Sequence, residues 1–339
     1  MSESPETPLV QVDNLDKHFS GSARFMGRSR SVLHAVDDVS FSIDRGETLG
    51  LVGESGSGKS TLARCVVRLH HLSAGRVLFD GEDISTMSTR QLRPYRSRMQ
   101  FIFQDPFASL NPRRRVVSII AEPLIVTGGQ SHHDAHDAAR ELMVRVGLDP
   151  RHADRFPAQF SGGQRQRIGV ARALALRPEF VVCDEPVSAL DISIQAQVIN
   201  LLADLQDELG LTYLFIAHDL SVVRHVSDRV AVMYLGRLVE LAPTEDLYYA
   251  PRHPYTRALL DAAPVADPDK RSTTSVLAGE IPSPLHPPSG CRFRTRCPRA
   301  QELCAREVPP LDPIDEGHLV ACHFPLEAPR VQLRSSSQQ

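Results

Sequence analysis

A glycine-rich stretch near the start of the chain constrains the fold more than any other feature. Residues 53–61 fit the pattern Gly-x-x-x-x-Gly-Lys-[Ser/Thr] of the phosphate-binding loop. Residues 48–52 before it are typical of a short buried strand, and residues 62–69 after it are typical of a helix. The residues of the loop are Gly53, Glu54, Ser55, Gly56, Ser57, Gly58, Lys59, Ser60 and Thr61.

The chemistry of this loop predicts the binding of a nucleoside triphosphate with Mg²⁺. Its three glycines let the backbone curl until its N–H groups face phosphate oxygens, and the following helix directs its positive end at the same place. Lys59 can bridge the β- and γ-phosphates, and the Ser60 hydroxyl can ligate Mg²⁺. The alternative is a Gly/Ser-rich turn that matches by chance, and the strand and helix on either side disfavour it.

Length and composition limit the remaining possibilities. A chain of 339 residues is enough for one large domain with an appendage or for two domains. The formal net charge of −3 argues against a general nucleic-acid binder. No window approaches 18 consecutive apolar residues, and the polar, acidic start has no signal peptide, so we expect a cytoplasmic protein. Its six cysteines are then not expected to form disulfides.

The periodicity of the chain predicts an α/β fold. Residues 9–47 are expected to be antiparallel β structure with a loop over 21–31, and residues 107–175 are expected to be helical, with Ala135, Ala138, Leu142 and Val146 on one apolar face. Ile194, Val198, Leu201, Leu205 and Leu209 predict the buried face of a later helix. Strands are expected at 99–103, 180–183 and 213–217, with hairpins over 75–84 and 230–241.

Polar side chains follow three of the predicted strands, where sheets of this kind bind ligands. Gln104 follows the strand 99–103 and can reach Mg²⁺ or a water. Asp184 and Glu185 follow 180–183, so that Asp184 can hold Mg²⁺ and Glu185 can polarise the attacking water. His218 follows 213–217 and can contact a γ-phosphate. The alternatives are a surface glutamine, an acidic turn and a structural histidine.

Two further features have weaker signals of their own. Ser161, Gly162, Gly163 and Gln164 open a helix: Ser161 is a good N-cap, and the glycines let helix N–H groups approach an anion closely. Phe19, just before the loop 21–31, is equally consistent with a core aromatic and with a platform on which a nucleobase stacks.

In this combination the chain resembles the ATP-binding subunits of ABC transporters. The phosphate loop, Gln104, Ser161 to Gln164, Asp184-Glu185, Ser188 to Asp191 and His218 stand in the family's order and at its spacing, with Phe160 where the family has leucine. The resemblance implies a RecA-like core with an N-terminal antiparallel β subdomain and a helical subdomain, about 107–175, within residues 1–250. It also implies that Phe19 stacks on adenine.

A narrower resemblance covers residues 104–325 and is to the peptide-importer branch of that family. It rests on residues 104–112, 185–195 and 253–256, and on the cysteine-bearing tail. This branch carries oligopeptides and dipeptides, and some members carry nickel or glutathione. The sequence of residues 105–109 resembles that of the second of the two ATPases that such importers pair. Residues 251–339 would then be a small Cys-rich extension.

The resemblance implies a transport ATPase that works as a head-to-tail dimer with a second ABC ATPase. Ser161 to Gln164 of one subunit would cover the nucleotide of the other, and the helical segment would dock two transmembrane permease subunits. An extracytoplasmic solute-binding protein would join through the complex. The chain would lie at the cytoplasmic face of the membrane as a peripheral subunit, without nucleic acid.

The tail predicts a metal centre. Residues 282–325 hold nine prolines in 44 positions, and so small a segment needs a staple. Cys291, Cys297, Cys304 and Cys322, with gaps of five, six and 17 residues, predict a [4Fe–4S] cluster, with Zn²⁺, or free thiols or disulfides, as alternatives. Four arginines between 292 and 299 are expected to favour thiolates. Because the tail follows every nucleotide motif, its expected role is structural or redox-sensing, not hydrolytic.

Two other functions compete with transport. A soluble ABC ATPase acting on nucleic acid or ribosomes tends to have two cassettes or a long coiled coil, and this sequence has neither. A non-hydrolysing regulatory partner would have a degraded site, whereas Lys59, Asp184, Glu185 and His218 are all present.

Overall fold

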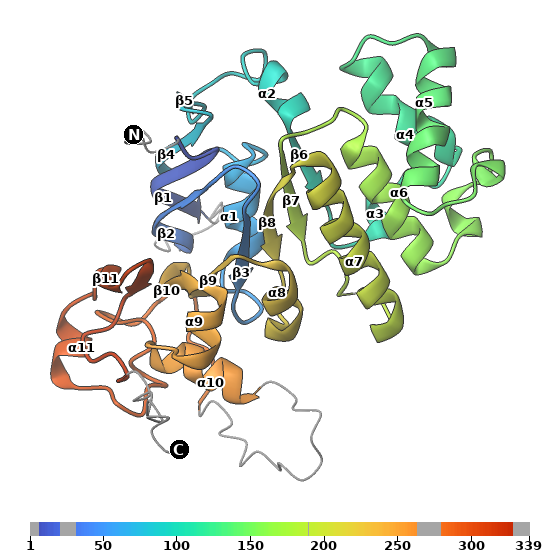
Figure 1. Ribbon diagram of the computed structural model, residues 1–339. Helices are drawn as coiled ribbons and strands as arrows, with labels where there is room; N and C mark the ends of the chain where they lie inside the picture. Colours follow the sequence, from blue (N-terminus) through green and yellow to red (C-terminus); the bar gives the residue numbers. More distant parts are fainter. Residues whose placement is uncertain (1–6, 21–31, 189, 263–278, 328–339) are drawn as a thin grey trace, which may run out of the picture.

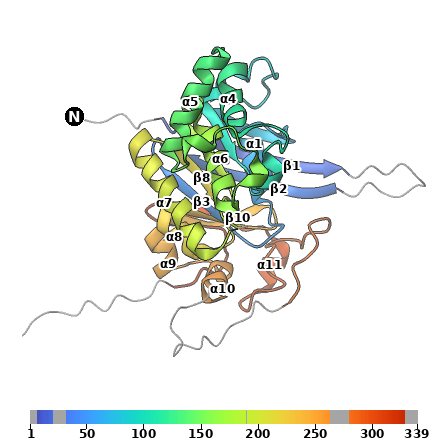
Figure 2. The ribbon, with the colours of Figure 1, turned by 90° about the vertical axis from the view of Figure 1, so that its right-hand side faces the viewer.

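The computed structural model describes residues 7–20, 32–188, 190–262 and 279–327. The expected loop over 21–31 and Ala189 of the Ser188–Asp191 motif lie outside these residues. Figures 1 and 2 show one end of the molecule formed by helices α4 and α5 and the opposite end formed by α10 and α11. Within the described residues, no helix combines the length and the apolar composition needed to cross a membrane.

The N-terminal residues form the predicted antiparallel sheet. Its strands are β1 (Val10–Ser20), β2 (Val32–Ile43), β4 (Ala74–Phe79) and β5 (Glu82–Asp83), in the order β2-β1-β4-β5. Asp80 and Gly81, both with positive φ, close the predicted hairpin between β4 and β5.

A second sheet of eight strands forms the centre of the molecule. The strands β3 (Thr48–Val52), β6 (Met99–Ile102), β7 (Phe180–Asp184), β8 (Thr212–Ile216) and β9 (Arg229–Tyr234) pair in parallel in the order β9-β3-β8-β7-β6. β10 (Arg237–Pro243), β12 (His318–Val320) and β11 (Asp312–Asp315) continue it antiparallel beyond β9. Every residue of β3, β7 and β8 is buried, as expected of strands covered on both faces.

Helices cover both faces of this sheet. α1 (Lys59–Val66) packs into the hydrophobic cluster that the central sheet shares with the N-terminal sheet, and α7 (Ile192–Leu209) packs into the cluster on the other face. Val198 and Leu205 of the predicted α7 face are buried, Ile194 and Leu201 are partly buried and Leu209 is exposed, while Ile199 and Leu202 are buried in addition. The shorter helices are α2 (Arg93–Arg98), α8 (Leu220–Val226) and α9 (Thr244–Tyr249).

The helical segment follows β6. It contains α3 (Pro106–Ser109), α4 (Val116–Val126), α5 (His132–Arg145) and α6 (Gly162–Leu174), with 3-10 turns at Pro150–His152 and Pro157–Gln159. α5 begins at the N-cap Ser131 and ends before Gly147, which has φ 72°. Its fully buried residues are Ala135, Ala139 and Met143, whereas the predicted Ala138 and Leu142 are partly buried.

The C-terminal extension has little regular structure, as predicted. It contains α10 (Pro254–Ala262), α11 (Glu302–Arg306), β11 and β12. It nevertheless packs against the rest of the molecule, because β12 pairs with β10 and because Tyr255 and Phe293 are buried members of the main hydrophobic cluster. Figure 1 shows α11 and β11 on the side of the molecule away from the helical segment, and β12 stands between β11 and β10 in the sheet.

Candidate functional site

The glycines of the phosphate loop are required by close backbone approaches. Gly53, with φ 151°, has the carbonyl oxygen of Met233 only 2.2 Å from the place where a Cβ would stand. Gly58, with φ 106°, has the carbonyl oxygen of Ala35 at 2.1 Å from that place. A side chain at either position would displace backbone, so the loop can take its path between β3 and α1 only with glycine there.

Lys59 is buried at the base of the loop. Its side chain donates to the carbonyl oxygens of Gly53 at 2.6 Å and Glu54 at 3.1 Å. Burial lowers the pKa of Lys59, while the neighbouring Glu185 and Asp184 carboxylates act to raise it. The loop, its lysine and the two acidic residues predicted after β7 therefore lie in one site.

Asp184 offers an oxygen to a cation. It is the last residue of β7 and is 1% exposed. Its Oδ1 accepts a 2.7 Å hydrogen bond from the Ser60 hydroxyl, while its buried Oδ2 has no hydrogen-bond partner and lies 3.7 Å from the Arg64 guanidinium. Burial raises the pKa of Asp184, as it does for a carboxylate that lacks full compensation.

These two oxygen donors fit Mg²⁺ bound together with a nucleotide. Among the described residues, no group of three or more His, Cys, Asp and Glu side chains is arranged to hold a metal ion by itself. Mg²⁺ does not need such a group, because it commonly binds one or two protein ligands together with substrate phosphates and waters. Ser60 and Asp184 are the residues that would hold it.

Glu185 stands at the junction of three sequence motifs. Its Oε2 accepts a 2.8 Å hydrogen bond from Gln104 Nε2 and lies 3.6 Å from His218 Nδ1. Its backbone has φ 46°, a strained value for a residue other than glycine, and its N–H donates to the carbonyl oxygen of Ile216 at 3.0 Å. The ends of β6, β7 and β8 thus bring the three predicted side chains together, at the edge where parallel sheets bind ligands.

Phe19 lies at the end of β1 with 37% of its surface exposed. The Lys17 ammonium lies 4.8 Å from the centre of its ring, and the ring of His70 meets it edge-on with centroids 5.8 Å apart. An exposed ring in this position is available for stacking and is not part of the core.

The helix start at Ser161 is capped within itself. Ser161 Oγ accepts from the backbone N–H of Gln164 at 3.3 Å, and Gln164 Oε1 accepts from the N–H of Ser161 at 3.0 Å. Gly163 is buried, and a Cβ on it would stand 2.4 Å from Ile194 Cγ2 of α7. Gly163 is therefore required by packing inside this subunit, in addition to leaving helix N–H groups bare at Gly162.

The four tail cysteines line one small cavity. Its volume is about 10 Å³, and His253 and Phe293 also line it. Burial raises the pKa of Cys291 and Cys297, and raises that of Cys322 to about 11. The expectation that nearby arginines favour the thiolates is wrong for two of the four arginines. Arg292 pairs with Asp37 and Arg296 pairs with Glu54, and both carboxylates lie outside the tail.

Sequence reasoning missed the contact between this tail and the phosphate loop. Arg296 forms two hydrogen bonds with the Glu54 carboxylate, and the Tyr255 hydroxyl accepts one from the Glu54 N–H. The partners are 201 and 242 positions apart. Tyr255 stands in a stretch that carries the family resemblance, but nothing in that stretch indicates its partner.

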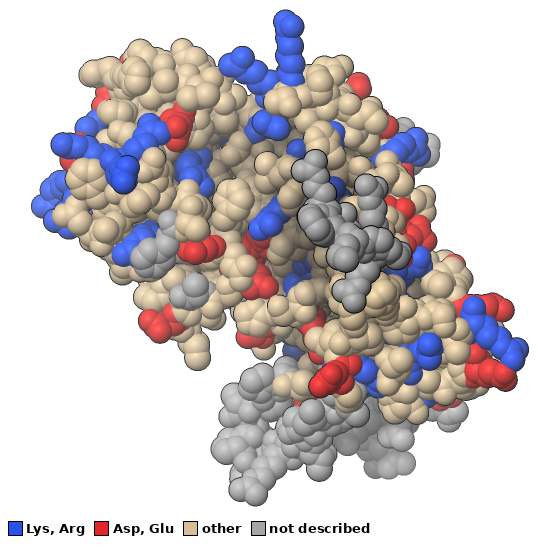
Figure 3. Space-filling model, turned by 180° about the vertical axis from the view of Figure 1, so that it is seen from behind, with Lys and Arg blue, Asp and Glu red and all other residues tan. Residues whose placement is uncertain are grey.

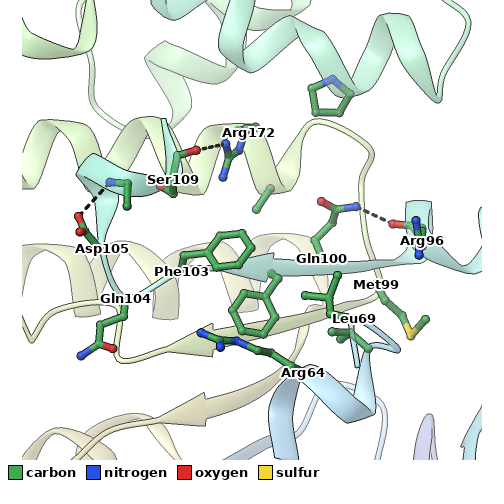
Figure 4. A pocket seen from close by; sticks show the side chains of 15 residues that line it. Arg64, Leu69, Arg96, Met99, Gln100, Phe103, Gln104, Asp105, Ser109 and Arg172 are labelled. Atoms are coloured by element: carbon green, nitrogen blue, oxygen red, sulfur yellow. Dashed lines mark hydrogen bonds between the residues drawn. The ribbon is translucent and has the colours of Figure 1, made fainter. Parts of the chain in front are cut away.

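A groove of about 700 Å³ lies between the core and the helical segment. Leu69, Met99, Phe101 and Phe103 give it an apolar floor, while Arg64, Arg96 and Arg172 add basic side chains. Figure 4 shows Arg64 of α1 and Arg172 of α6 on opposite sides of Phe103, with Gln104 at one end. The groove therefore connects the helical segment with a residue that contacts Glu185.

Comparison with known families and proteins agrees with this geometry. The ABC transporter family profile matches residues 36–188, and the profile of the oligopeptide/dipeptide transporter C-terminal region matches residues 239–304. A putative peptide import ATP-binding protein of Brucella ovis is 55% identical, with 94% of this chain and 98% of that protein covered. The oligopeptide transport ATP-binding protein AppF of Bacillus subtilis is 51% identical, with 96% and 99% covered.

Solved structures lead to the same family. CbiO1 of Clostridium perfringens, part of an ABC transporter complex, superposes with a TM-score of 0.62 at 26% identity, covering 72% of this chain and 91% of that one. The ATP-binding cassette MJ0796, in a dimeric post-hydrolysis state with ADP and Pi, gives 0.62 at 29%, covering 69% and 98%. The predicted ABC ATPase fold is thereby confirmed. The chain belongs to the ABC transporter family as an ATP-binding protein, in the branch that has the oligopeptide/dipeptide transporter C-terminal region.

Proposed function

We propose that this chain is the ATP-hydrolysing subunit of an ABC importer for oligopeptides or dipeptides. The relatives whose names specify peptide or oligopeptide transport cover nearly the whole chain, which favours peptides over nickel or glutathione. The single observation that carries hydrolysis is that Asp184 and Glu185 join the phosphate loop to the strand ends, through Ser60 at 2.7 Å and Gln104 at 2.8 Å. A soluble ABC ATPase and a non-hydrolysing partner gain no comparable support.

The residues divide the work of hydrolysis among them. Phe19 stacks on adenine, the N–H groups of residues 55–60 surround the phosphates, and Lys59 moves from its loop carbonyls to the β- and γ-phosphates. Ser60, Gln104 and Asp184 would hold Mg²⁺, which would supply charge stabilisation to the phosphates. Glu185 takes a proton from the attacking water, and His218 contacts the γ-phosphate.

A head-to-tail dimer supplies the rest of the site. Ser161, Gly162, Gly163 and Gln164 would face the nucleotide of a second ABC ATPase subunit, with the helix start of α6 directed at its γ-phosphate. The dimeric MJ0796 cassette supports pairing of two such subunits. We infer from the sequence of residues 105–109 that this chain is the second of two different ATPases in the importer.

The groove beside Gln104 is the proposed docking site for a permease subunit. The proposed occupant is a short amphipathic helix of the permease, with its apolar face on Phe101 and Phe103. Its acidic or C-terminal end would meet Arg64, Arg96 and Arg172, since helix C-termini attract cations. Figure 3 shows basic and acidic side chains interspersed over the rear face of the molecule.

The proposed organisation follows from these partners. Residues 1–250 form the nucleotide-binding domain with its helical subdomain at about 107–175, and residues 251–339 form the extension. Two permease subunits hold the ATPase pair at the cytoplasmic face of the membrane, and an extracytoplasmic solute-binding protein delivers the peptide.

A metal centre at the four tail cysteines is a second proposal, with [4Fe–4S] as the first candidate and Zn²⁺ as the alternative. The four thiols line one cavity, but as placed they do not form a group that could hold a metal ion. A cavity of about 10 Å³ holds one water-sized sphere, so a four-iron cube requires the cysteine segments to move apart. Anaerobic purification with iron, sulfide and zinc analysis distinguishes the candidates, and Cys297→Ser should lose whichever metal is bound.

The experiment that tests the main proposal is Lys59→Ala. Loss of the buried ammonium should abolish binding of a fluorescent ATP analogue and ATPase activity in the assembled transporter, because the γ-phosphate loses its cation. Arg306→Met, which removes an exposed ion pair in the tail, is the control. Unchanged analogue affinity in Lys59→Ala would refute the assignment of the phosphate loop.

A further inference from the structure

The second residue of the phosphate loop is held by the C-terminal extension. Arg296 donates to the Glu54 carboxylate from both terminal nitrogens, at 2.6 Å and 3.1 Å. The side chain of Arg296 is 4% exposed and that of Glu54 is 23% exposed. A two-pronged, largely buried guanidinium–carboxylate pair fixes orientation as well as charge, unlike an exposed ion pair.

The backbone of Glu54 is held on the same side. Its N–H donates to the hydroxyl of Tyr255 at 2.9 Å, so it is directed away from the phosphate cradle. Its carbonyl oxygen accepts from Lys59 at 3.1 Å. When Lys59 turns to phosphate, the bonds to Arg296 and Tyr255 remain on Glu54, together with the one that its carbonyl oxygen accepts from the Ser57 N–H at 3.1 Å within the loop.

The groups that hold Glu54 have a rigid support. Tyr255, Tyr234 and Phe293 are fully buried, with ring centroids 4.7 Å to 5.3 Å apart. Arg292 of the extension donates to the carbonyl oxygen of Leu235, and the next residue, Gly236, donates its N–H to the Ser57 carbonyl oxygen at 2.8 Å. The extension thus reaches the phosphate loop directly and through the turn between β9 and β10.

The charge of Glu54 gives this contact a consequence for ATP. A carboxylate on the loop that surrounds a triphosphate repels it, and the repulsion is strong where water is scarce. Arg296 supplies the opposite charge through its two hydrogen bonds to the carboxylate. We propose that Arg296 and Tyr255 are positioning residues for ATP: they hold Glu54, neutralise its charge and thereby make the C-terminal extension part of the nucleotide site. This inference rests on the proposed ATPase function.

The test is a set of variants of the full-length chain, measured by titration with a fluorescent ATP analogue. Arg296→Met is expected to weaken binding by about 10- to 100-fold, the range for losing a hydrogen bond to a charged group. Glu54→Gln combined with Arg296→Met should recover most of that loss, because no uncompensated carboxylate remains. Tyr255→Phe should weaken binding by about 2- to 10-fold while its ring stays in place.

Matched measurements separate positioning from simple destabilisation. Arg306→Met removes another arginine–carboxylate pair of the extension, an exposed one, and should bind as the unmodified chain does. In the assembled transporter, Arg296→Met should raise KM for ATP and change kcat less than about threefold, since Glu185 is untouched. Arg296→Lys keeps the charge if the methionine variant fails to fold, and should weaken binding less.

The outcomes are decisive in both directions. Equal affinity in Arg296→Met and the unmodified chain, with normal folding, overturns the inference, and so does a loss that Glu54→Gln fails to rescue. Failure of the ATPase proposal itself would appear differently, as absent nucleotide binding in the unmodified chain or unchanged binding in Lys59→Ala.

Discussion

The two flanks of the phosphate loop differ in exposure and in chemistry. The catalytic flank, formed by Gln104, Asp184, Glu185 and His218, is polar, and its histidine side chain is 60% exposed. The extension flank, formed by Tyr234, Tyr255, Phe293 and Arg296, is aromatic and buried. The catalytic flank reaches the surface at His218, while the extension flank contacts the phosphate loop through Arg296 and Tyr255. We infer that turnover depends on the first flank and nucleotide affinity on both.

Breaking the catalytic flank should give the largest effect. Glu185→Gln keeps the shape of the side chain but removes its basicity, so kcat for ATP hydrolysis should fall by roughly 10²–10⁴. Affinity for the ATP analogue should stay within a few-fold, because the loop and the extension flank are unchanged. Near-normal turnover in the assembled transporter would remove Glu185 from the role of base.

Breaking the extension flank should act on stability instead. Phe293→Ala removes a fully buried ring and should lower the free energy of unfolding by about 3–5 kcal/mol. Denaturant titration followed by circular dichroism measures this loss, and Phe293→Leu should lose less. If Phe293→Ala unfolded like the unmodified chain, the extension would not be packed as part of the core.

The extension flank should also respond to pH. Burial lowers the pKa of His253 to about 4, against the opposing effect of Glu240, and its Nδ1 accepts from the Tyr255 N–H. Between pH 6.5 and about 4 the unfolded chain therefore binds a proton that the folded chain does not. The free energy of unfolding should fall as pH drops through this window, by up to about 3 kcal/mol.

Unfolding titrations at several pH values check this dependence. His253→Asn keeps an acceptor near Tyr255 but cannot titrate, so its stability should decline less over the same range. His318, which pairs with buried Glu240 at 2.7 Å, is unchanged in both proteins. Equal pH dependence in the two proteins would contradict the assignment to His253.

The smallest expected change in stability concerns the helix start proposed to face the partner's nucleotide. Ser161→Ala removes the N-cap of α6 and should lower the free energy of unfolding by about 1 kcal/mol. The matched Ser131→Ala, at the start of α5, should have the same effect. Only Ser161→Ala should weaken ATP-dependent dimerisation, measured by light scattering. Equal dimerisation in the two variants would argue against the head-to-tail arrangement. Gly163 is a poorer target, because any side chain there collides with Ile194.

The catalytic flank was predictable from the sequence because its signals are local. A glycine-rich loop between a strand and a helix, and acidic residues after a buried strand, are each contained in about ten residues. The sheet then brings the strand ends together by a general rule of parallel pairing. The helix faces were predicted less well: in α5 Ala139 and Met143 are fully buried rather than Ala138 and Leu142, and in α7 Ile199 and Leu202 are buried beside the predicted Val198 and Leu205.

The sequence by itself determined the phosphate loop, the residues at the strand ends and the family. Only the tertiary structure decided what lies behind the loop, because Arg296 and Glu54 are 242 positions apart and no local pattern records their pairing. It likewise decided the strained φ of Glu185 and the required absence of a Cβ at Gly53, since both depend on neighbours from other strands. The expectation that the tail has no part in hydrolysis rested on chain order, whereas contact with the phosphate loop depends on how β12, Tyr255 and Phe293 pack against the central sheet.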